Sequence, residues 1–415
     1  MTEQTRQRED EANTGAPMLP RAGAGSAWEV FIAFLRLGLT SFGGPVAHLG
    51  YFRAEFVDRR KWTDERSYAD LVALCQFLPG PASSQVGMAL GMQRAGWLGA
   101  LSAWAGFTLP SALALIAFAY GVALDSALAS SGAVRGLKIV AVAVVAQAVW
   151  GMARTLCPDR TRAALAIGAS LLVLALPSAV AQLAVIVACG LAGAAWVKLV
   201  HEPAVTHAGY GVSRRAATVA LVAFALLLVG LPVAQAVAPV QWLAMVEGYY
   251  RAGALVFGGG HVVLPLLQST VVTPGWVSAD EFLAGYGAAQ AVPGPLFTFA
   301  AYLGAVAQGP LTGWMGGLAM LVAIFVPAAL LVLGALPFWD AWRQHAGARS
   351  TMAGINSGVV GILLAALYDP VWTSAIHNRT DFALGLAAFG LLVVGRVSPV
   401  CVVSIAALGG WALYG

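Results

Sequence analysis

The stretch Gln76-Phe77-Leu78-Pro79-Gly80-Pro81 decides the fold, because it returns as Gln290-Ala291-Val292-Pro293-Gly294-Pro295 in an equally apolar setting. A Pro-Gly-Pro run ends any helix drawn through it. Each proline lacks an amide proton and clashes with the preceding turn, while glycine adopts backbone angles that no other residue takes at low cost. Two such breaks at matching places predict a duplicated chain whose helices are interrupted inside apolar surroundings.

The composition around these breaks is that of an integral membrane protein. Hydrophobic residues make up 59% of the chain and charged residues 10%, so there is too little polar surface to cover a soluble globule. The net charge of +4 is modest and the basic residues sit in short connections, which argues against nucleic-acid binding. The four cysteines have no CxxC or metal-ligand spacing, and we expect neither a metal nor a cofactor.

Thirteen apolar segments follow a polar start. Residues 1–26 mix charge with Gly, Ala and Pro and lack the apolar centre of a signal peptide, so we expect a disordered cytoplasmic tail. Most of the segments have about the 20 residues that a membrane-spanning helix needs, or slightly fewer. They are residues 28–52, 68–92, 97–124, 134–152, 163–176, 179–200, 216–238, 242–270, 282–308, 311–337, 351–367, 382–394 and 397–413.

The landmarks of the first half return in the second at nearly constant spacing. Arg36 and Arg251 are 215 residues apart, as are Phe42 and Phe257; Pro79 and Pro293 are 214 apart, and Pro110 and Pro327 are 217 apart. We therefore predict an N-terminal repeat over 27–200, a connecting span over 201–240 and a C-terminal repeat over 241–415. One connecting span inverts the second half relative to the first, so the predicted fold is an all-α, polytopic membrane protein with two inverted repeats.

The basic segment between Arg53 and Arg66 distinguishes two topologies. If all thirteen segments cross the bilayer, its five basic residues lie outside the cell, against the positive-inside tendency. If the two broken segments of each half are re-entrant hairpins, this loop becomes cytoplasmic, and the matching loops of the second half, which carry no Lys or Arg, face outside. We expect the hairpins, with thirteen full crossings as the alternative. The four breaks should then meet near the midplane, because irregular backbone inside a bilayer must be buried in protein or line a wet cavity.

Two arginines sit at equivalent positions inside apolar segments. Arg36 and Arg251 each precede a Phe-Gly-Gly by six residues, and a central arginine costs about 2.5–3.5 kcal/mol on insertion scales. A structural ion pair is the alternative, but two matched arginines favour a functional pair. Guanidinium groups and the free amides of broken helices both bind oxyanions. We expect Arg36 to make the closer contact, because the first half has more polar neighbours.

The other candidate substrate-binding residues flank the breaks. Helix capping or interhelical bonding is the alternative for each polar one. His48 and His261 lie near, but not at, matching positions, which argues against a proton relay, and Glu247 lies near the end of its segment, so a carboxylate relay has little support. The candidates are Ser41, Gly43, Gly44, Gln76, Pro79, Gly80, Pro81 and Ser83 in the first half, with Gly258, Gly259, Gln290, Pro293, Gly294 and Pro295 in the second.

These motifs resemble a known family. Phe34–Pro45 and Gln76–Gln85, with their partners Arg251–Gly260 and Gln290–Pro295, are similar to the paired motifs of the chromate ion transporter family, and Tyr368–Trp372 resembles its long-chain, two-domain members. The resemblance implies efflux of chromate from the bacterial cytoplasm, giving resistance, with sulfate as the close structural analogue. One departure is Gly260 where the first copy has Pro45, so the two halves need not contribute equally.

Rival functions differ in class. An intramembrane enzyme is disfavoured, because no GxSxG, HExxH or paired Asp on neighbouring spans is present. A transporter of sulfate or another oxyanion that works as an importer remains open, as do the coupling ion and a homodimer. The expected setting is the bilayer of a bacterial inner membrane, crossed many times, with chromate or sulfate as the small-molecule partner and no nucleic acid.

Overall fold

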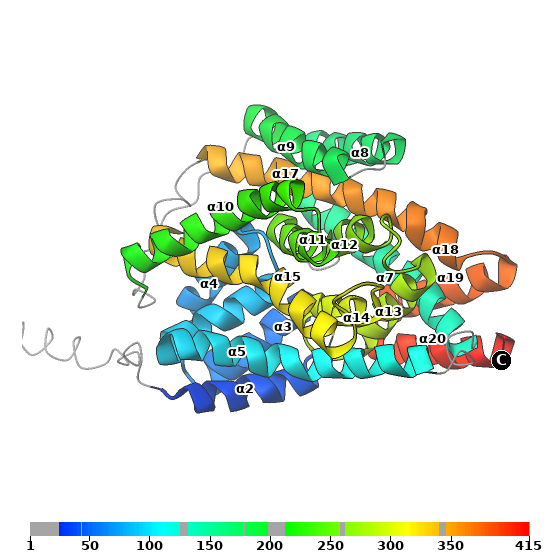
Figure 1. Cartoon of the computed structure of the whole chain (residues 1–415), viewed down its shortest axis with the longest axis horizontal. Helices are drawn as coiled ribbons and strands as arrows, with labels where there is room; N and C mark the ends of the chain where they lie inside the picture. The colour runs from blue at the N-terminus through cyan, green and yellow to red at the C-terminus, as the bar shows by residue number, and fades with distance from the viewer. Residues whose placement is uncertain are drawn as a thin grey trace, which may run out of the picture.

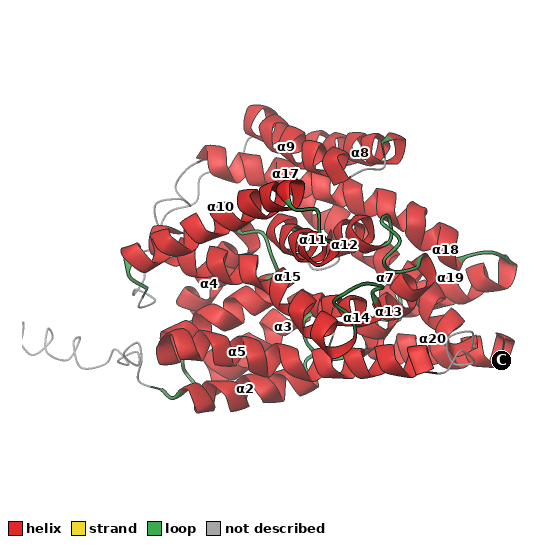
Figure 2. Cartoon of the chain, in the orientation of Figure 1, coloured by secondary structure: helices red, strands yellow, loops and turns green. Residues whose placement is uncertain are grey.

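The computed structural model describes residues 25–42, 44–124, 132–176, 179–197, 212–257, 262–339 and 346–414, and all regular structure within these ranges is helical (Figures 1 and 2). The first repeat contains α2 (Ala27–Thr40), α3 (Gly44–Phe52), η1 (Arg53–Arg59), α4 (Glu65–Phe77), α5 (Ala82–Leu124), α7 (Gly132–Leu156), α8 (Arg160–Ala175) and α9 (Ala179–Trp196). The connecting helix is α10 (Arg214–Val237). The second repeat contains α11 (Gln241–Leu255), α12 (Val263–Val271), α13 (Ala279–Ala291), η3 (Leu296–Thr298), α14 (Phe299–Val306), α15 (Gly313–Ala335), η4 (Leu336–Phe338), α17 (Ala346–Ala366), η5 (Leu367–Trp372), α18 (Thr373–Ala375), α19 (Arg379–Val393) and α20 (Pro399–Tyr414).

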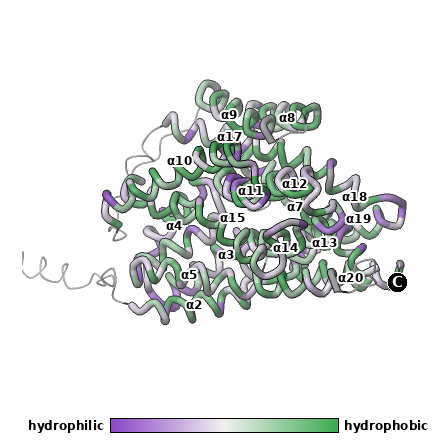
Figure 3. Tube along the Cα trace, in the orientation of Figure 1, coloured by the Kyte–Doolittle hydropathy of each residue, from purple (hydrophilic) through white to green (hydrophobic). Residues whose placement is uncertain are grey.

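Each of the thirteen predicted apolar segments contains helix, and the all-α, repeated membrane fold is confirmed. Among the described residues, five helices are long and apolar enough to cross a bilayer: Ala82–Gly121, Gly132–Leu156, Arg214–Val237, Gly313–Phe338 and Gly347–Ala375. Figure 3 shows hydrophilic stretches near both ends of the long axis, beside α2 and α10 at one end and beside α18 and α19 at the other. The predicted tail lies outside the described residues, apart from Gly25 and Ser26.

The helices that carry the breaks are shorter than a full span. α2 has 14 residues, α3 has 9 and α4 has 13. At 1.5 Å per residue, none of them exceeds about 21 Å, whereas the hydrocarbon core is about 30 Å thick. α5 is two helices joined at a kink, since Ala95 and Gly96 leave helical geometry. In Figure 1, α2 starts at the lower left and ends near the middle, beside α5.

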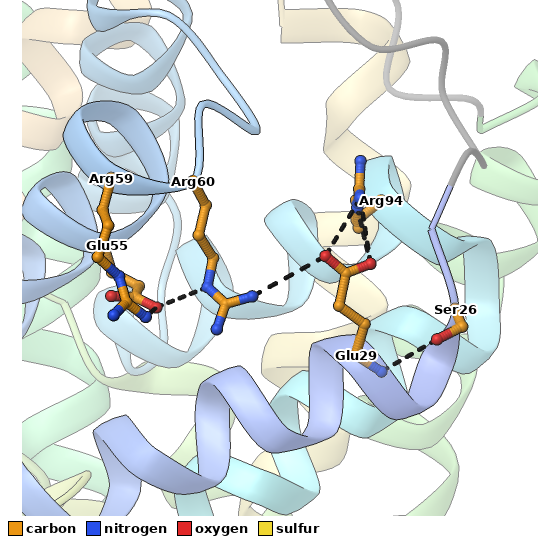
Figure 4. A network of polar contacts seen from close by, with 6 residues as sticks. All are labelled: Ser26, Glu29, Glu55, Arg59, Arg60 and Arg94. Atoms are coloured by element: carbon orange, nitrogen blue, oxygen red, sulfur yellow. Dashed lines mark hydrogen bonds and ion pairs between the residues drawn. The ribbon is translucent and has the colours of Figure 1, made fainter.

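The beginning of α2, the end of η1 and the kink of α5 lie together (Figure 4). The Gly25 N–H donates to the Arg94 carbonyl at 3.0 Å. The Glu29 carboxylate lies 3.1 Å from the Arg94 guanidinium and 3.9 Å from that of Arg60. The chain therefore leaves this end of the molecule along α2 and returns by η1, then leaves again along α4 and returns at Arg94, tracing two hairpins.

The same cluster keeps the Glu55 carboxylate ionised and holds two arginines in place. Burial opposes ionisation of Glu55, but hydrogen bonds from Arg60 and Arg59 outweigh it and hold the pKa of this carboxyl below its ordinary value. The guanidinium groups of Arg60 and Arg94 also lie over the Trp62 ring, at 5.5 and 5.3 Å from its centroid. Cations over an aromatic face are attracted by its negative quadrupole. The ring therefore helps to hold the two arginines in place.

The second repeat closes its two hairpins with neutral contacts. The Gln241 side chain donates to the Gln308 carbonyl at 2.7 Å, and the Gln308 N–H donates to the Trp276 carbonyl at 2.9 Å. Gln308 and Trp276 are the repeat counterparts of Arg94 and Trp62, each 214 residues further on. One set of hairpin ends is thus rich in arginine and the other has uncharged glutamine in the same place, as the positive-inside tendency predicts for faces on opposite sides of a membrane.

The long helices after the hairpins exchange partners between repeats. α7 packs against α19 and α20 of the second repeat, while its counterpart α17 packs against α8 and α9 of the first. Glycine allows both approaches: a Cβ at Gly136 would overlap the Ala406 carbonyl, and one at Gly354 would overlap the Cys189 carbonyl. The division at 201–240 remains a prediction about the sequence; in space, helices of the two halves interleave.

Candidate functional site

The two Pro-Gly-Pro breaks each bond to the other repeat. The Gly80 N–H donates to the Val256 carbonyl at 2.7 Å, and the Gly294 N–H donates to the Ser41 carbonyl at 2.9 Å. Ser41 and Val256 are 215 residues apart, and Gly80 and Gly294 are 214 apart. The same hydrogen bond is therefore made twice, in opposite directions, from the break of one hairpin to the end of α2 or α11 in the other half. These bonds place each Pro-Gly-Pro break beside the end of α2 or α11 of the other half, and we call this region the crossing.

Glycine is required at both breaks. Gly80 has φ +117° and Gly294 has φ +92°, values that side-chain-bearing residues rarely adopt. A Cβ would also lie 2.9 Å from the Ala328 Cβ at Gly80, and 2.7 Å from the Ser111 Oγ at Gly294. Ser111 and Ala328 directly follow Pro110 and Pro327, the matched prolines inside α5 and α15. Each break thus packs against the proline-containing helix of the opposite repeat.

The carbonyl groups at the breaks are satisfied by side chains. The Gln85 side chain donates to the Pro79 carbonyl at 2.9 Å, and the Ser111 hydroxyl donates to the Pro293 carbonyl. The Thr298 hydroxyl donates to the Pro295 carbonyl at 2.8 Å. Because these bonds occupy acceptors, the groups without an intrahelical partner at the start of α5 and of η3 are backbone N–H donors, which carry the positive end of the helix dipole.

Several buried polar atoms near the crossing have no partner among the described residues. His48 connects them: its Nδ1 lies 3.5 Å from the Ser83 Oγ, and its ring packs edge-on against Phe107 at 5.2 Å. A buried polar atom without a hydrogen bond costs roughly 1–3 kcal/mol, so such a cluster marks a place where water or a ligand completes the bonding. The atoms are Ser41 Oγ, His48 Nε2, Ser84 Oγ, Gln85 Oε1, Thr108 Oγ1 and Gln290 Nε2.

The structure gathers many of the predicted site residues at the crossing. Ser41, Gly80, Pro81 and Ser83 are buried there, with Pro79 and the second Pro-Gly-Pro run beside them. Gly44 starts α3 with φ +78° and open space where a Cβ would stand, and Gln290 is half-buried. Gln76, by contrast, is exposed on α4. Gly43, Gly258 and Gly259 lie outside the described residues.

Sequence reasoning missed part of the polar cluster. The sequence does not predict Thr108 or Gln85 as site residues, because one hydroxyl or amide in an apolar helix gives no repeat signal. His48 has no partner at the matching position of the second repeat. The detectable signal was position: Gln85 follows the first Pro-Gly-Pro closely, and Thr108 stands two residues before Pro110.

The two arginines differ in their surroundings. Arg36 is exposed on α2, and its backbone carbonyl accepts a hydrogen bond from the Thr40 hydroxyl at 2.7 Å. Arg251 is half-buried, its Nε lies 3.1 Å from Glu247 Oε1, and it lines a pocket with Leu183, Ser269 and Thr270. Which arginine is more important for the substrate remains a prediction, and this geometry favours Arg251.

Two basic residues near the start of α7 form ion pairs. Lys138 Nζ lies 2.8 Å from Asp280 Oδ1, and Arg135 lies 3.1 Å from the buried Asp381 carboxylate. The Tyr414 hydroxyl donates to the same carboxylate at 2.6 Å. In the hairpin topology Arg135 and Lys138 do not lie on the cytoplasmic side, contrary to the positive-inside tendency, and these pairs give each of them a local counter-charge. Lys138 therefore forms its ion pair with the first turn of α13.

Comparison with known proteins finds the same family in each of the two repeats. The family described as Chromate transporter matches residues 28–194 and again residues 243–411, once for each half of the fold. The chain belongs to the chromate transporter family. The resemblance seen in the motifs is thereby confirmed, and membership of a transporter family points away from an enzyme.

Relatives in the chromate transporter family align along nearly the whole chain. The chromate transport protein of Pseudomonas aeruginosa is 29% identical over 405 residues, covering 93% of this chain and 92% of its own. The probable chromate transport protein of Synechococcus elongatus is 26% identical and covers 86% and 87%. The chromate transport protein of Cupriavidus metallidurans is 24% identical and covers 93% of each. No solved structure matches the chain.

Proposed function

We propose that this protein is a secondary active transporter that exports chromate, a tetrahedral oxyanion and sulfate analogue, from the cytoplasm across the inner membrane of a bacterium, and so confers chromate resistance. Family membership and the relatives named as chromate transport proteins support the substrate. The apolar helices support a multi-pass membrane setting.

The reciprocal hydrogen bonds at the crossing are the observation that carries a transport mechanism. Inverted repeats whose broken helices meet at one place can present the same site first to one side of the membrane and then to the other. Gly80 to Val256 and Gly294 to Ser41 are equivalent bonds and both are closed here, so breaking one of them would open one side while the other keeps the opposite side closed. The proposed binding site lies here, formed by backbone amides at the breaks and by the neighbouring hydroxyl groups.

The membrane potential suffices to drive such an exporter. Moving one elementary charge across 100 mV involves about 2.3 kcal/mol, so a dianion leaving a negatively charged cytoplasm gains about twice that. Nucleotide hydrolysis is not needed, in keeping with the lack of a Walker motif in the sequence.

Flux in proteoliposomes tests this function. Vesicles loaded with chromate and given an inside-negative potential by potassium and valinomycin should release chromate only when they contain the protein. Reversing the potential should reverse the flux. Sulfate flux without chromate flux would replace the proposal by a sulfate transporter, and flux of neither anion at either potential would refute it.

A further inference from the structure

The ion pair between Glu247 and Arg251 has no counterpart in the first repeat. Both residues lie on α11, one helical turn apart, and their side chains are 12% and 31% exposed, respectively. The residue equivalent to Glu247 is Ile32, so Arg36 has no carboxylate one turn before it. A carboxylate is thus held specifically against the arginine that lines a pocket.

The helices around this pair leave it electrostatically isolated. α10, α12 and α15 pack against α11, and α12 and α15 contain no ionisable residue. α10 has Arg214 and Arg215 at its start only, and α9, which contributes Leu183 to the pocket, has Cys189. On α11 itself, the Tyr250 hydroxyl is engaged with the Phe224 carbonyl, and the Tyr249 hydroxyl is buried without a partner. Among these described elements, Glu247 is the one carboxylate facing Arg251.

Arg251 also lines a small pocket, whose volume of about 10 Å³ is that of a single water molecule, so an anion would bind here only as the pocket widens. Ser269 and Thr270 of α12 line it, opposite Leu183 of α9. Their hydroxyl groups are directed to the Leu266 carbonyl, at 2.9 and 2.8 Å, and a rotation about one bond would turn either toward an anion. Gly248 brings α11 and α12 together here, since a Cβ at this position would collide with Thr270. The pocket and the ion pair therefore share one cation.

An arginine keeps its proton at any physiological pH, whereas a carboxylate in an apolar environment gains one readily. A dianion beside Arg251 would leave excess negative charge as long as Glu247 stays ionised. Proton uptake by Glu247 lowers this excess from two negative charges to one, because it converts the carboxylate to a neutral carboxyl group, and it frees the guanidinium. No other bond forms or breaks in this step.

We propose that Glu247 and the transported oxyanion compete for the guanidinium of Arg251, so that the anion binds together with one proton taken up by Glu247. The proposal rests on the proposed function and extends it: it adds an anion contact at Arg251, five residues before Val256 of the crossing, and names Glu247 as a positioning residue that links anion binding to proton uptake. The asymmetry between the repeats then has a role, because only the arginine of the second half has a carboxylate beside it whose protonation controls anion binding.

Proton uptake on binding is the direct test. Chromate is titrated into the purified full-length protein by calorimetry, in buffers with different ionisation enthalpies, to count the protons bound per anion. Wild type should take up about one proton more than Glu247→Gln. Chromate itself titrates, but equally for both proteins, so the difference isolates Glu247. Asp280→Asn, which changes an exposed carboxylate of the same repeat, should give the wild-type count.

The affinity provides a second readout. The Kd of wild type should fall by up to tenfold for each unit that the pH is lowered, in excess of any change seen for Glu247→Gln, because one more proton is linked to binding. At neutral pH the Gln variant should bind more tightly, since it lacks the competing charge.

A third measurement needs no variant. Infrared difference spectra of wild type should show a protonated carboxyl C=O band appearing when chromate binds. Equal proton counts for wild type and Glu247→Gln, or no such band, would overturn the proposal while leaving chromate transport in place. Absence of chromate binding and flux would overturn the proposed function as well.

Discussion

At the scale of single residues, the glycines of the two breaks combine a backbone demand with a packing demand. Gly80 and Gly294 have positive φ, and both pack against the proline-containing helix of the opposite repeat. Gly96, at the kink of α5, has a positive φ of +65° but open space where a Cβ would stand. The three positions therefore separate conformational strain from crowding.

We expect Gly80→Ala and Gly294→Ala to lose both stability and chromate flux, and Gly96→Ala to lose less stability, through its φ alone, and to keep its flux. An unfavourable φ costs of the order of 1–3 kcal/mol at each position. Crowding adds to this at the breaks, more at Gly80, where the obstacle is the Cβ of Ala328, than at Gly294, where the Ser111 hydroxyl can rotate. Thermal unfolding in detergent and flux in proteoliposomes measure the two effects. Similar losses for all three variants would show that crowding at the crossing is unimportant.

Some features of the crossing can be predicted from the sequence and others cannot. Pro-Gly-Pro runs and matched spacing predicted both breaks and their meeting, because helix termination is a local property of proline and glycine. Partners could not be predicted: nothing in the sequence indicates that the Gly80 amide bonds to the Val256 carbonyl, which is contributed by a segment far along the chain. The exposure of Arg36 and the pairing of Arg251 with Glu247 were likewise hidden, since they depend on which face of α2 and α11 packs inward.

At the scale of elements, the short helices form two hairpin pairs whose ends carry different charge. Arg59 belongs to the charged end of the first repeat, and its counterpart 214 residues later is Thr273, which is exposed in the turn after α12. The structure shows the hairpin paths; their re-entrant position in a membrane stays a prediction.

Cysteine labelling of these two positions tests the topology. In a background without the four native cysteines, Arg59→Cys should react with an impermeant thiol reagent only after the cells are permeabilised. Thr273→Cys should react in intact cells, because the inverted repeat places it on the outer face. If both positions react in intact cells, the hairpins of the first repeat do not enter from the cytoplasm, and thirteen full crossings become the better description.

At the scale of the whole molecule, the exchange of partners between α7 and α17 ties the halves together. Gly136 and Gly354 let these helices approach the backbone of α20 and α9 closely. Periodicity predicted both helices but not the exchange, because all sides of a membrane helix are apolar and the pattern does not indicate which neighbour it meets.

Alanine substitutions can measure the exchanged contacts. Gly136→Ala and Gly354→Ala should each lower the melting temperature, because overpacking costs about 1–3 kcal/mol and outweighs the roughly 1 kcal/mol by which alanine favours a helix. Gly151→Ala, in the same helix as Gly136 but with open space around it, should leave the melting temperature unchanged or raise it. A rise in all three variants would mean that the close approach contributes nothing to stability.

The exchange of partners also sets the order in which the protein can be completed. α7 enters the bilayer long before the ribosome has made α19 and α20, which are its eventual neighbours at the end of the chain. Until then its packing face, with Gly136 near the start of the helix, must be covered by lipid or by the insertion machinery. Insertion of α19 and α20 is therefore the event that closes the first half, and loss of α20 would leave α7 without one of its two partners from the second repeat.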